Sequence, residues 1–508
     1  MSQVELFKQA IDNGYATKGD FIVLGGAMLN EKTVLRDTFV KAPLRTLNRH
    51  GLIAGATGTG KTKTIQVLTE TLSLKGVPIM LMDIKGDLSG LAAEGECNAK
   101  IEERHEKIGI PYEPMPFPVE LLSLSEEKGA RLRATVSEFG PVLFSKILDL
   151  NDTQAGIVAL VFKYADDNGL PLLDIKDFRK VVNYLSNEGK AEIEETYGSF
   201  SSVSVGAILR KLIELEQQGA DVFFGERSFD PQDLLRQQQG KGVVSILRLT
   251  DLQDRPKLFS TFMLSLLAEI YSTFPEEGDL DKPKLLIFID EAHLIFNEAS
   301  KALLNQIETI VKLIRSKGVG IIFCTQNPTD VPDEVLSQLG LKVQHALRAF
   351  TAKDRKMIKL TAENYPISEF YTIDEMLTSL GIGEAAITVL DEKGRPTPLA
   401  RTLLCAPRSR MDILDEKEIN TLVKNSKIAT KYNEEIDRES AYEMLGKKFP
   451  ANEEKTAEKA APKSVAKGKK DPTIIETVSK NTFVRQMGRT ILRELTRGFM
   501  GVLTGKRR

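Results

Sequence analysis

The sequence contains no tryptophan, and it has only three cysteines and four histidines among 508 residues. Cys97, Cys324 and Cys405 show no C-x-x-C spacing, and their odd number argues against a disulfide framework and for a reducing compartment. We interpret all three as small buried hydrophobic residues. The histidines form no cluster with the spacing of metal ligands, so the sequence does not predict a zinc site.

The chain also lacks an excess of either charge and any long apolar run. Its 69 basic and 71 acidic residues give a formal net charge of −2, so no overall positive field would draw the protein to nucleic acid. A surface for nucleic acid must therefore be local or be built by oligomerisation. No apolar run approaches the length of a membrane span, and the N-terminal segment lacks the apolar core of a signal peptide. We expect a soluble, cytoplasmic protein.

Strand-like and helical patterns alternate along the chain and predict an α/β fold with a mostly parallel sheet. The run "HGLIAGA" at His50 has the character of a strand, "KTKTIQVLTETLSLKG" that of an amphipathic helix, and "VPIMLMDIKGD" (77–87) that of a second strand. This succession is typical of parallel α/β sheets. From about 97 to 240 helical periodicity prevails, after which strand-like runs resume and end in a predicted hairpin at 384–407.

Composition divides the chain further. The segment at 448–472 is rich in Lys, Glu, Ala and Pro with hardly any large apolar residues, which predicts a disordered linker. The predicted segments are a short β-rich N-terminal module at 1–45, an α/β core at 46–96 and 241–407, a helical insertion at 97–240, a helical extension at 408–447, the linker at 448–472 and a basic amphipathic tail at 473–508.

A phosphate-binding loop follows the first strand of the predicted core. Gly55, Gly60, Lys61 and Thr62 match G-x-x-x-x-G-K-[ST], in which backbone N–H groups wrap a phosphate chain, the lysine reaches the outer phosphates and the hydroxyl binds Mg²⁺. The following helix directs its positive N-terminal end at the anion. We therefore expect a nucleoside triphosphate and Mg²⁺ to bind here. The candidate nucleotide-binding residues of the loop are Gly55, Ala56, Thr57, Gly58, Thr59, Gly60, Lys61, Thr62 and Lys63.

Two carboxylates follow a later apolar strand, in "LLIFIDEAH". A buried strand that ends in Asp290 and Glu291 is unfavourable unless these side chains face a polar site, which the phosphate loop would supply. Asp290 would hold Mg²⁺ through its water shell, and Glu291 would polarise the attacking water. Gln326 follows a third apolar strand, "VGIIFCTQNP". Since strand ends converge in a parallel sheet, Gln326 would sense the γ-phosphate or orient the water.

The motifs together resemble a known family. "RHGLIAGATGTGKT", "FIDEAH", "LIRSKGVGIIFCTQNP" and "VQHALRAF", in this order, are similar to the HerA/FtsK family of hexameric DNA-pumping ATPases. The likeness is to a bacterial branch of helicase HerA-like C-terminal domain-containing proteins, which share the helical insertion, "DIKGDLSG" and "DRESAYEML" (437–445). It covers roughly residues 20 to 445. It implies a RecA-like P-loop NTPase core, ATP and Mg²⁺ as cofactors, and a homohexameric ring that moves or unwinds duplex DNA.

The resemblance also assigns roles to single residues. It gives Lys61 and Thr62 to phosphate and Mg²⁺, Asp290 and Glu291 to the acid pair, and Gln326 to sensing. Arg315 in "LIRSKGVG" matches the arginine finger that one subunit supplies to the site of its neighbour. Arg49 matches a second family arginine, and Arg348 lies at another strand end, so both are further candidates for contact with the nucleotide.

The cargo stays open between two classes. HerA itself carries a sizeable N-terminal β-barrel for partner docking, which residues 1–45 cannot build in full. The alternative to a DNA translocase is therefore a regulatory or scaffold ATPase that acts on protein partners without helicase activity. A superfamily 2 helicase, a GTPase and a transporter ATPase are not favoured, because the chain lacks the motifs S-A-T, N-K-x-D and L-S-G-G-Q in the required places.

The tail has the pattern of a basic amphipathic helix. Arg485, Arg489, Arg493 and Arg497 recur every four residues and so share one helical face. Such a helix can bind nucleic acid, lie on an anionic membrane or pack against its own ring. The sequence does not distinguish these three partners.

Overall fold

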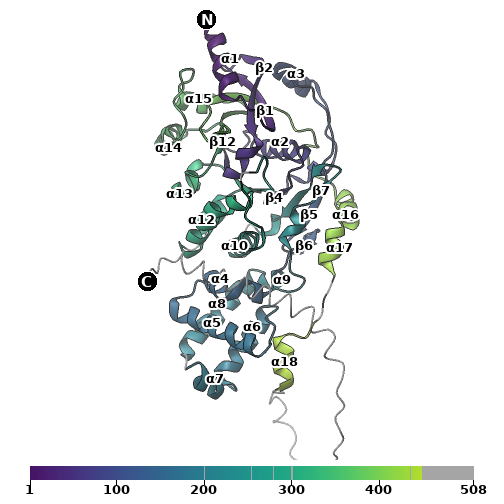
Figure 1. The fold of residues 1–508 in the computed structure, drawn as a ribbon, viewed down its shortest axis with the longest axis vertical. Coiled ribbons are helices and arrows are strands. Elements are labelled where there is room, and N and C mark those ends of the chain that lie inside the picture. Colours follow the sequence, from purple (N-terminus) through teal and green to yellow (C-terminus); the bar gives the residue numbers. More distant parts are fainter. Residues whose placement is uncertain are drawn as a thin grey trace, which may run out of the picture. The chain divides into compact units, whose positions relative to one another are not determined.

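The computed structural model describes residues 1–448 (Figure 1), except for residues 199, 200, 253, 254, 279, 299, 300, 435 and 437. Residues 1–441 form one compact unit and residues 442–508 a second. The predicted basic tail and, apart from Lys448, the predicted linker lie outside the described residues. None of the helices in this part of the chain combines the length and the apolar character that crossing a bilayer requires.

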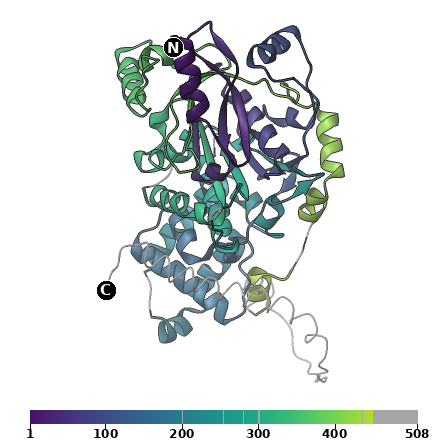
Figure 2. The same cartoon turned by 45° about the horizontal axis from the view of Figure 1, so that its top comes forward.

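One twelve-stranded sheet organises the described part of the first unit (Figure 2). Eight neighbouring strands run parallel, in the order β12-β3-β11-β10-β4-β9-β5-β6. Beyond β12 the sheet continues in antiparallel pairs through β13, β14, β1 and β2. The predicted α/β class with a mostly parallel sheet is therefore confirmed.

The bounds of the parallel strands are Gly51–Ala54 (β3), Ile79–Asp83 (β4), Val119–Ser123 (β5), Ala130–Arg131 (β6), Val244–Arg248 (β9), Leu285–Ile289 (β10), Val319–Thr325 (β11) and Leu341–Gln344 (β12). The antiparallel strands are Phe21–Met28 (β1), Val34–Pro43 (β2), Glu384–Thr388 (β13) and Ala400–Leu404 (β14). The pairing of β13 with β14 confirms the hairpin predicted at 384–407. A separate two-stranded hairpin joins Gln237–Gln238 (β7) to Lys241–Gly242 (β8).

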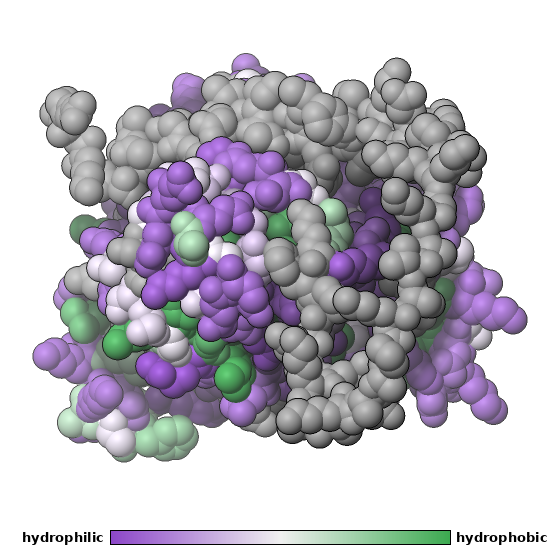
Figure 3. Space-filling view, turned by 90° about the horizontal axis from the view of Figure 1, so that it is seen from below, coloured by the Kyte–Doolittle hydropathy of each residue, from purple (hydrophilic) through white to green (hydrophobic). Residues whose placement is uncertain are grey.

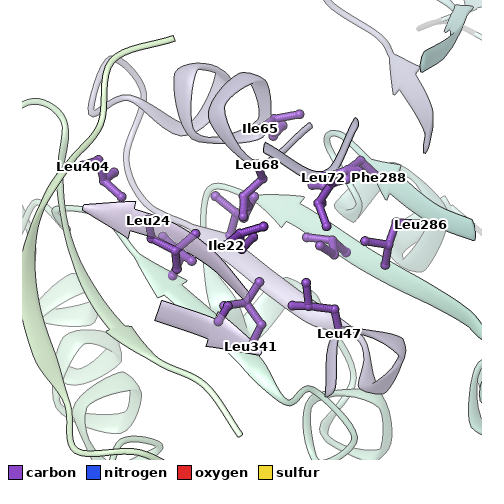
Figure 4. Packing of buried hydrophobic residues seen from close by; sticks show 14 of the residues in the cluster. Ile22, Leu24, Leu47, Ile65, Leu68, Leu72, Leu286, Phe288, Leu341 and Leu404 are labelled. Atoms are coloured by element: carbon purple, nitrogen blue, oxygen red, sulfur yellow. The ribbon is translucent and has the colours of Figure 1, made fainter. Parts of the chain in front are cut away.

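The centre of the sheet is apolar on both faces. Every residue of β10 and of β11 is buried, as expected for parallel strands that helices cover on both sides. Helix α2 (Lys61–Leu74) packs Ile65, Leu68 and Leu72 into the core around Leu286 and Phe288 (Figure 4). Each such side chain stabilises the fold by about 1.5–3 kcal/mol when it leaves water. This packing fixes the start of α2, and with it the phosphate loop, against the strands.

The N-terminal residues extend the main sheet. Strands β1 and β2 lie within the predicted N-terminal module at 1–45; they pair with each other, and β1 also pairs with β14. They are preceded by helix α1 (Gln3–Gly14), which the sequence patterns did not predict. Its N-terminus is closed by a capping box between Ser2 and Glu5. The Tyr15 hydroxyl lies 2.9 Å from the carbonyl oxygen of Ile387 and 2.7 Å from that of Pro398, which ties this segment to β13 and the loop before β14.

The predicted helical insertion at 97–240 requires correction at both ends. Strands β5 and β6 lie inside it but join the parallel sheet, and the helices of the insertion run only from Val136 to Phe223. Strand β5 carries the charged Glu120, and β6 has two residues, so neither shows the apolar run that marks a central strand. The insertion helices are Val136–Ile147 (α4), Asp152–Asp167 (α5), Ile175–Ser186 (α6), Lys190–Thr196 (α7), Ser202–Gln217 (α8) and Ala220–Phe223 (α9).

An aromatic core holds the insertion together. Phe144 lies 4.9 Å from Phe178 and 5.9 Å from Phe162 between ring centroids, so α4, α5 and α6 share one centre. Helix α4 also contacts α10 (Pro256–Thr273) and α12 (Lys301–Ile314), which connects the insertion to the helices of the α/β core.

The described residues on the face seen in Figure 3 are mostly hydrophilic, with scattered hydrophobic side chains.

The remaining helices lie between and after the strands. Helix α3 contacts β1 and β2. The predicted helical extension at 408–447 contains α16, α17 and most of α18. The bounds are Ala99–Ile108 (α3), His293–Glu298 (α11), Asp333–Leu336 (α13), Ala352–Glu363 (α14), Ile373–Ser379 (α15), Glu416–Asn425 (α16), Lys427–Asn433 (α17) and Ala441–Lys448 (α18).

Candidate nucleotide-binding site

The loop at 55–62 connects β3 to α2, as the motif requires. Gly55 has a φ of 152°, and a Cβ atom there would lie 2.5 Å from the Cβ atom of His345. Gly60 caps α2 in the left-handed conformation with a φ of 115°. Both positions therefore demand glycine, for lack of space at the first and for backbone conformation at both.

Lys61 is buried at the first position of α2 and lies within the curve of the loop. Its ammonium donates hydrogen bonds to the carbonyl oxygens of Gly55 at 2.7 Å and Ala56 at 3.1 Å. Burial lowers its pKa. Two backbone hydrogen bonds also join the loop to its neighbours. The N–H of Gly55 donates to the carbonyl oxygen of Thr325 at the end of β11, and the N–H of Ala56 donates to that of Ala346, just after β12. Thr57 and Gly58 at the tip are exposed, and Thr59 donates to Ala56.

Asp290 and Glu291 follow β10 directly, and both are buried. Burial raises the pKa of Asp290, against the effect of the neighbouring Lys85 ammonium. Glu291 adopts a φ of 47°, which is uncommon for a residue other than glycine. Its Oε1 atom forms an ion pair with Lys85, and its Oε2 atom lies 3.2 Å from Nδ1 of His293.

The sheet register brings the predicted residues to one edge. Thr325 at the end of β11 pairs with Ala54 at the end of β3, and Ile289 at the end of β10 pairs with Phe323. Parallel strands β10, β11 and β3 therefore direct the acid pair, the exposed Gln326 and the phosphate loop to the same end of the sheet. Arg348, also exposed, follows β12 at this end.

Arg49 and Arg315 lie at the opposite end of the sheet. Arg49 ends the 3₁₀ turn Leu44–Arg49 just before β3, and Arg315 begins the turn Arg315–Lys317 just before β11. Because β3 and β11 are neighbours, both arginines precede adjacent strands. They are thus separated from the phosphate loop of their own chain by the length of the strands.

Two side chains after β4 belong to this site, although the sequence analysis assigned no role to either of them. Lys85 pairs with Glu291, and Asp87 accepts a hydrogen bond from the Thr62 hydroxyl at 3.2 Å. Asp83 holds the turn that carries them, and burial raises its pKa to about 7. The segment "DIKGD" was visible as the end of a strand, but only the adjacency of β4 and β10 shows what it faces.

His345 supports the loop from the neighbouring strand. It is fully buried, and its Nε2 atom lies 2.8 Å from the Thr64 hydroxyl on the first turn of α2. Burial lowers its pKa to about 4, so the ring is neutral around pH 7. Lys63, the last residue of the predicted loop set, bonds through its ammonium to the carbonyl oxygen of Met411.

The donor set fits Mg²⁺ and a triphosphate. The buried atoms Oδ1 of Asp87 and Oε2 of Glu291 form no hydrogen bond with any described residue. Thr62 and Asp290 supply the hydroxyl and carboxylate oxygens that Mg²⁺ prefers. Within the described ranges, no group of three or more His, Cys, Asp or Glu side chains could hold a metal by itself. Phosphate oxygens and waters would be further ligands of a bound Mg²⁺.

Parts of this sequence are similar to known proteins. It is 23% identical over 369 residues to the DNA double-strand break repair helicase HerA of Sulfolobus acidocaldarius, with 68% of this chain and 64% of the relative aligned. It is 23% identical over 409 residues to the probable helicase MJ1565 of Methanocaldococcus jannaschii, with 75% and 66% aligned. The chain thus matches less than two thirds of the length of these relatives.

Solved structures show the same fold. The unbound bacterial conjugative coupling protein TrwBdeltaN70 matches with a TM-score of 0.52 and 15% identity over 80% of this chain and 94% of that one. The plasmid coupling protein TrwB in complex with ADP and Mg²⁺ matches with a TM-score of 0.50 and 16% identity over 79% and 99%. The RecA-like P-loop NTPase fold is thereby confirmed.

The family assignment covers far more of the sequence than the nucleotide site. A family model described as Helicase HerA-like C-terminal matches residues 30–508. This range includes the phosphate loop, the acid pair and the insertion between them. The chain belongs to the helicase HerA-like C-terminal family.

Proposed function

We propose that the protein is a Mg²⁺-dependent ATPase of the HerA/FtsK type, which forms a homohexameric ring and couples ATP hydrolysis to the movement or unwinding of duplex DNA. The observation that carries the proposal is the placing of a phosphate loop beside a buried acid pair at one edge of the sheet. Either feature alone is compatible with other roles, whereas their meeting favours hydrolysis of a nucleoside triphosphate.

Nucleotide binding would rest on the loop and the start of α2. The loop N–H groups and the N-terminus of α2 would hold the phosphates, and Lys61 would turn from the carbonyls of Gly55 and Ala56 to the outer phosphates. Bound Mg²⁺, held by Thr62 and Asp290, would neutralise phosphate charge. The TrwB structure with ADP and Mg²⁺ supports this cofactor pair, since it shares the fold.

Hydrolysis would use Glu291 as the base. Attack by water forms a new bond to the γ-phosphorus and breaks the bond to the oxygen that bridges the β- and γ-phosphates. The proton of the water passes to the Glu291 carboxylate, and ADP and phosphate leave. Gln326, exposed at the neighbouring strand end, would orient the water.

The position of the arginines favours a site shared between copies. Arg49 precedes β3, whose far end carries the phosphate loop, and Arg315 precedes the neighbouring strand β11, so both are badly placed for the nucleotide of their own chain. In a ring, the Arg315 edge of one copy would face the nucleotide of its neighbour and neutralise charge in the transition state. Arg348 lies at the loop end and would act within its own chain.

Duplex DNA is the proposed cargo because two relatives are named as helicases. The described surface also offers a place for it, since Lys353, Lys356 and Lys359 of α14 are exposed and form no ion pair with any described residue. Phe350, just before this helix, is 85% exposed. Cationic side chains suit a phosphate backbone. Work on DNA by such an ATPase would place the protein in the cytoplasm.

ATP turnover measured with and without duplex DNA tests the function directly. We expect hydrolysis that requires Mg²⁺, is stimulated by DNA and disappears in Lys61→Ala, in a protein whose mass in solution is that of a hexamer. Absence of hydrolysis under all these conditions would refute the ATPase. Hydrolysis that ignores DNA but responds to a protein partner would favour the alternative, a regulatory or scaffold ATPase.

A further inference from the structure

Lys85 is mounted on a turn that leaves it little freedom. The Asp83 carboxylate accepts backbone hydrogen bonds from Gly86 at 2.8 Å, Asp87 at 3.2 Å and Leu88 at 3.1 Å. Gly86 has a φ of 75°, and a Cβ atom there would lie 2.7 Å from the Thr250 side chain. The backbone that carries Lys85 is thus fixed from both sides.

The Lys85 ammonium is directed at the acid pair. It contacts Oε1 of Glu291 and lies 4.0 Å from Oδ2 of Asp290. The ammonium of Lys61 bonds to the loop carbonyls instead, so the two lysines have separate partners in the site. Burial lowers the pKa of Lys85, but the negative charges of Asp290 and Glu291 raise it by more, so the pKa of Lys85 is raised overall.

The two oxygens of Glu291 have different surroundings. Oε1 is held by Lys85, whereas Oε2 is buried and makes no hydrogen bond with any described residue, although Nδ1 of His293 is 3.2 Å away. The backbone of Glu291 is also held at a φ of 47°. One oxygen is therefore anchored while the other is left to accept from a further donor.

A role in stability alone does not explain this pair. Ion pairs with buried carboxylates cost about as much in desolvation as they return in attraction, so they contribute little to folding. The phosphate contact already has a candidate in Lys61 at the loop, whereas the Lys85 ammonium is directed at a carboxylate from a fixed turn. The arrangement does fit the orientation of a carboxylate.

We propose that Lys85 is the positioning residue of Glu291: its ammonium anchors Oε1 and offsets the charge of two adjacent buried carboxylates, so that Oε2 faces the attacking water. This inference rests on the proposed ATPase function. Lys85 acts through Glu291 and does not itself touch the nucleotide. Its loss would leave the base free to rotate, and a displacement of about 1 Å can lower a rate by about a hundredfold.

Lys85→Met and Lys85→Arg test the inference against Lys75→Met, which removes a surface ion pair of 3.2 Å with Asp20. We expect Lys85→Met to lower kcat by about ten- to a hundredfold, with KM for Mg²⁺·ATP changed by less than about twofold. Lys85→Arg should restore part of kcat, since it keeps the cation. In a Glu291→Gln background, Lys85→Met should have no further effect on single-turnover hydrolysis.

Nucleotide binding supplies a readout that does not need turnover. With EDTA, the uncompensated acid pair of Lys85→Met should repel ATP, and the Kd should rise several-fold; with Mg²⁺ the Kd should stay within about twofold. The probe is a fluorescent ATP analogue. Lys75→Met should match the wild type in all these measurements.

Several results would overturn the inference. An unchanged kcat in Lys85→Met would do so, and so would a raised KM at constant kcat, which would assign Lys85 to the phosphates. If Lys85→Met and Lys85→Arg lost nucleotide affinity and thermal stability to the same extent, the role of Lys85 would be structural. If the wild type does not hydrolyse ATP, the proposed function fails, and an unchanged Kd in EDTA would then refute the Lys85 inference separately.

Discussion

At the scale of single residues, the two adjacent carboxylates of the acid pair have different surroundings. Asp290 continues the line of β10, with its charge opposed by burial, whereas Glu291 turns away at a positive φ and meets Lys85. This difference fits the proposed roles, in which Asp290 serves the metal and Glu291 the attacking water. Substitutions that remove a single property can separate these tasks.

Glu291→Gln removes the charge of the proposed base and keeps its size. We expect ATP to bind with near wild-type affinity while phosphate release falls by about a hundredfold or more, because general base catalysis contributes at least this much. Lys61→Ala, in contrast, should lose both affinity and turnover. Equilibrium nucleotide binding and steady-state phosphate release measure the two quantities. A wild-type rate in Glu291→Gln would show that Glu291 is not the catalytic residue.

His345 predicts a dependence of stability on pH. Burial lowers its pKa from 6.5 to about 4, so below pH 6.5 the unfolded chain binds a proton that the folded chain refuses. Folding stability from this group is complete above pH 6.5 and is lost as the pH falls towards 4, by about 2 kcal/mol between pH 7 and pH 5. His345→Gln should therefore show a smaller decrease in urea midpoint over this interval.

The quantity to compare is the difference in urea midpoint between the wild type and His345→Gln at each pH. This comparison is needed because Asp83 changes the stability with pH in the opposite sense. Burial raises its pKa to about 7, so its contribution to stability grows as the pH falls. Asp83 is present in both proteins, and its effect cancels in the comparison. Parallel midpoint curves for wild type and His345→Gln would contradict the assignment of a buried neutral ring.

At the scale of elements, the sequence predicts best where an apolar strand ends in a functional motif. Strands β3, β4, β10 and β11 are such runs, and the patterns located each of them. Strand β6 pairs over two residues, and the N-terminal helix α1 is a short amphipathic segment in a region with strand-like alternation. Local patterns do not resolve a strand of two residues, because its neighbours in space decide it, whereas α1 has the length and the capping box of a recognisable helix.

The same limit applies to the site. Asp290, Glu291 and the loop carry recognisable motifs, so the sequence predicts their proximity through the rule that parallel strand ends converge. Lys85 and Asp87 lie in "DIKGDLSG", a stretch that belongs to the family resemblance but for which the sequence assigned no role to either residue. Their place in the site depends on β4 lying beside β10, which is a fact of strand order. Strand order is what the sequence does not reveal.

Helix α14 carries a prediction about the cargo. Lys353, Lys356 and Lys359 are spaced by three residues and so lie near one face of the helix. Their joint replacement by glutamine should weaken duplex DNA binding and lower the slope of log Kd against log salt, by about one for each phosphate group that a lysine had neutralised. Fluorescence anisotropy with labelled duplex DNA at several salt concentrations measures both effects.

A matched control has the same change of charge elsewhere. Lys417, Lys424 and Lys427, in α16 and α17, are also exposed, and their replacement by glutamine should leave DNA binding near that of the wild type. Equal weakening in both triple variants would mean that α14 supplies only general positive charge. ATP turnover without DNA should be unchanged in both, because neither set touches the nucleotide site.

At the scale of the whole molecule, the predicted tail adds a second candidate surface for an anionic partner. Truncation after Pro472 removes Arg485, Arg489, Arg493 and Arg497, which lie outside the described residues, and spares the ATPase core. We expect rings and ATP hydrolysis to persist, while binding to DNA or to anionic lipid vesicles decreases in a salt-dependent manner. Unchanged binding to both would indicate that the tail packs within the protein. Loss of the ring would indicate that it joins subunits.

The polarity of the sheet leads to the last prediction. The phosphate loop and acid pair lie at the carboxyl ends of the parallel strands, and Arg315 lies at the amino end of β11, so one chain does not bring the two together. If Arg315 completes the site of a neighbouring copy, Arg315→Ala should lower turnover by several orders of magnitude while nucleotide affinity stays nearly intact. Mixing this variant with Glu291→Gln gives the decisive measurement. Each variant alone lacks one half of every site, but a mixed ring has some interfaces where an intact Glu291 meets an intact Arg315. ATP turnover should therefore recover in part after subunit exchange, and mass measurements on the mixed rings establish that exchange occurred. Persistent inactivity in confirmed mixed rings would mean that Arg315 does not act across the boundary between copies.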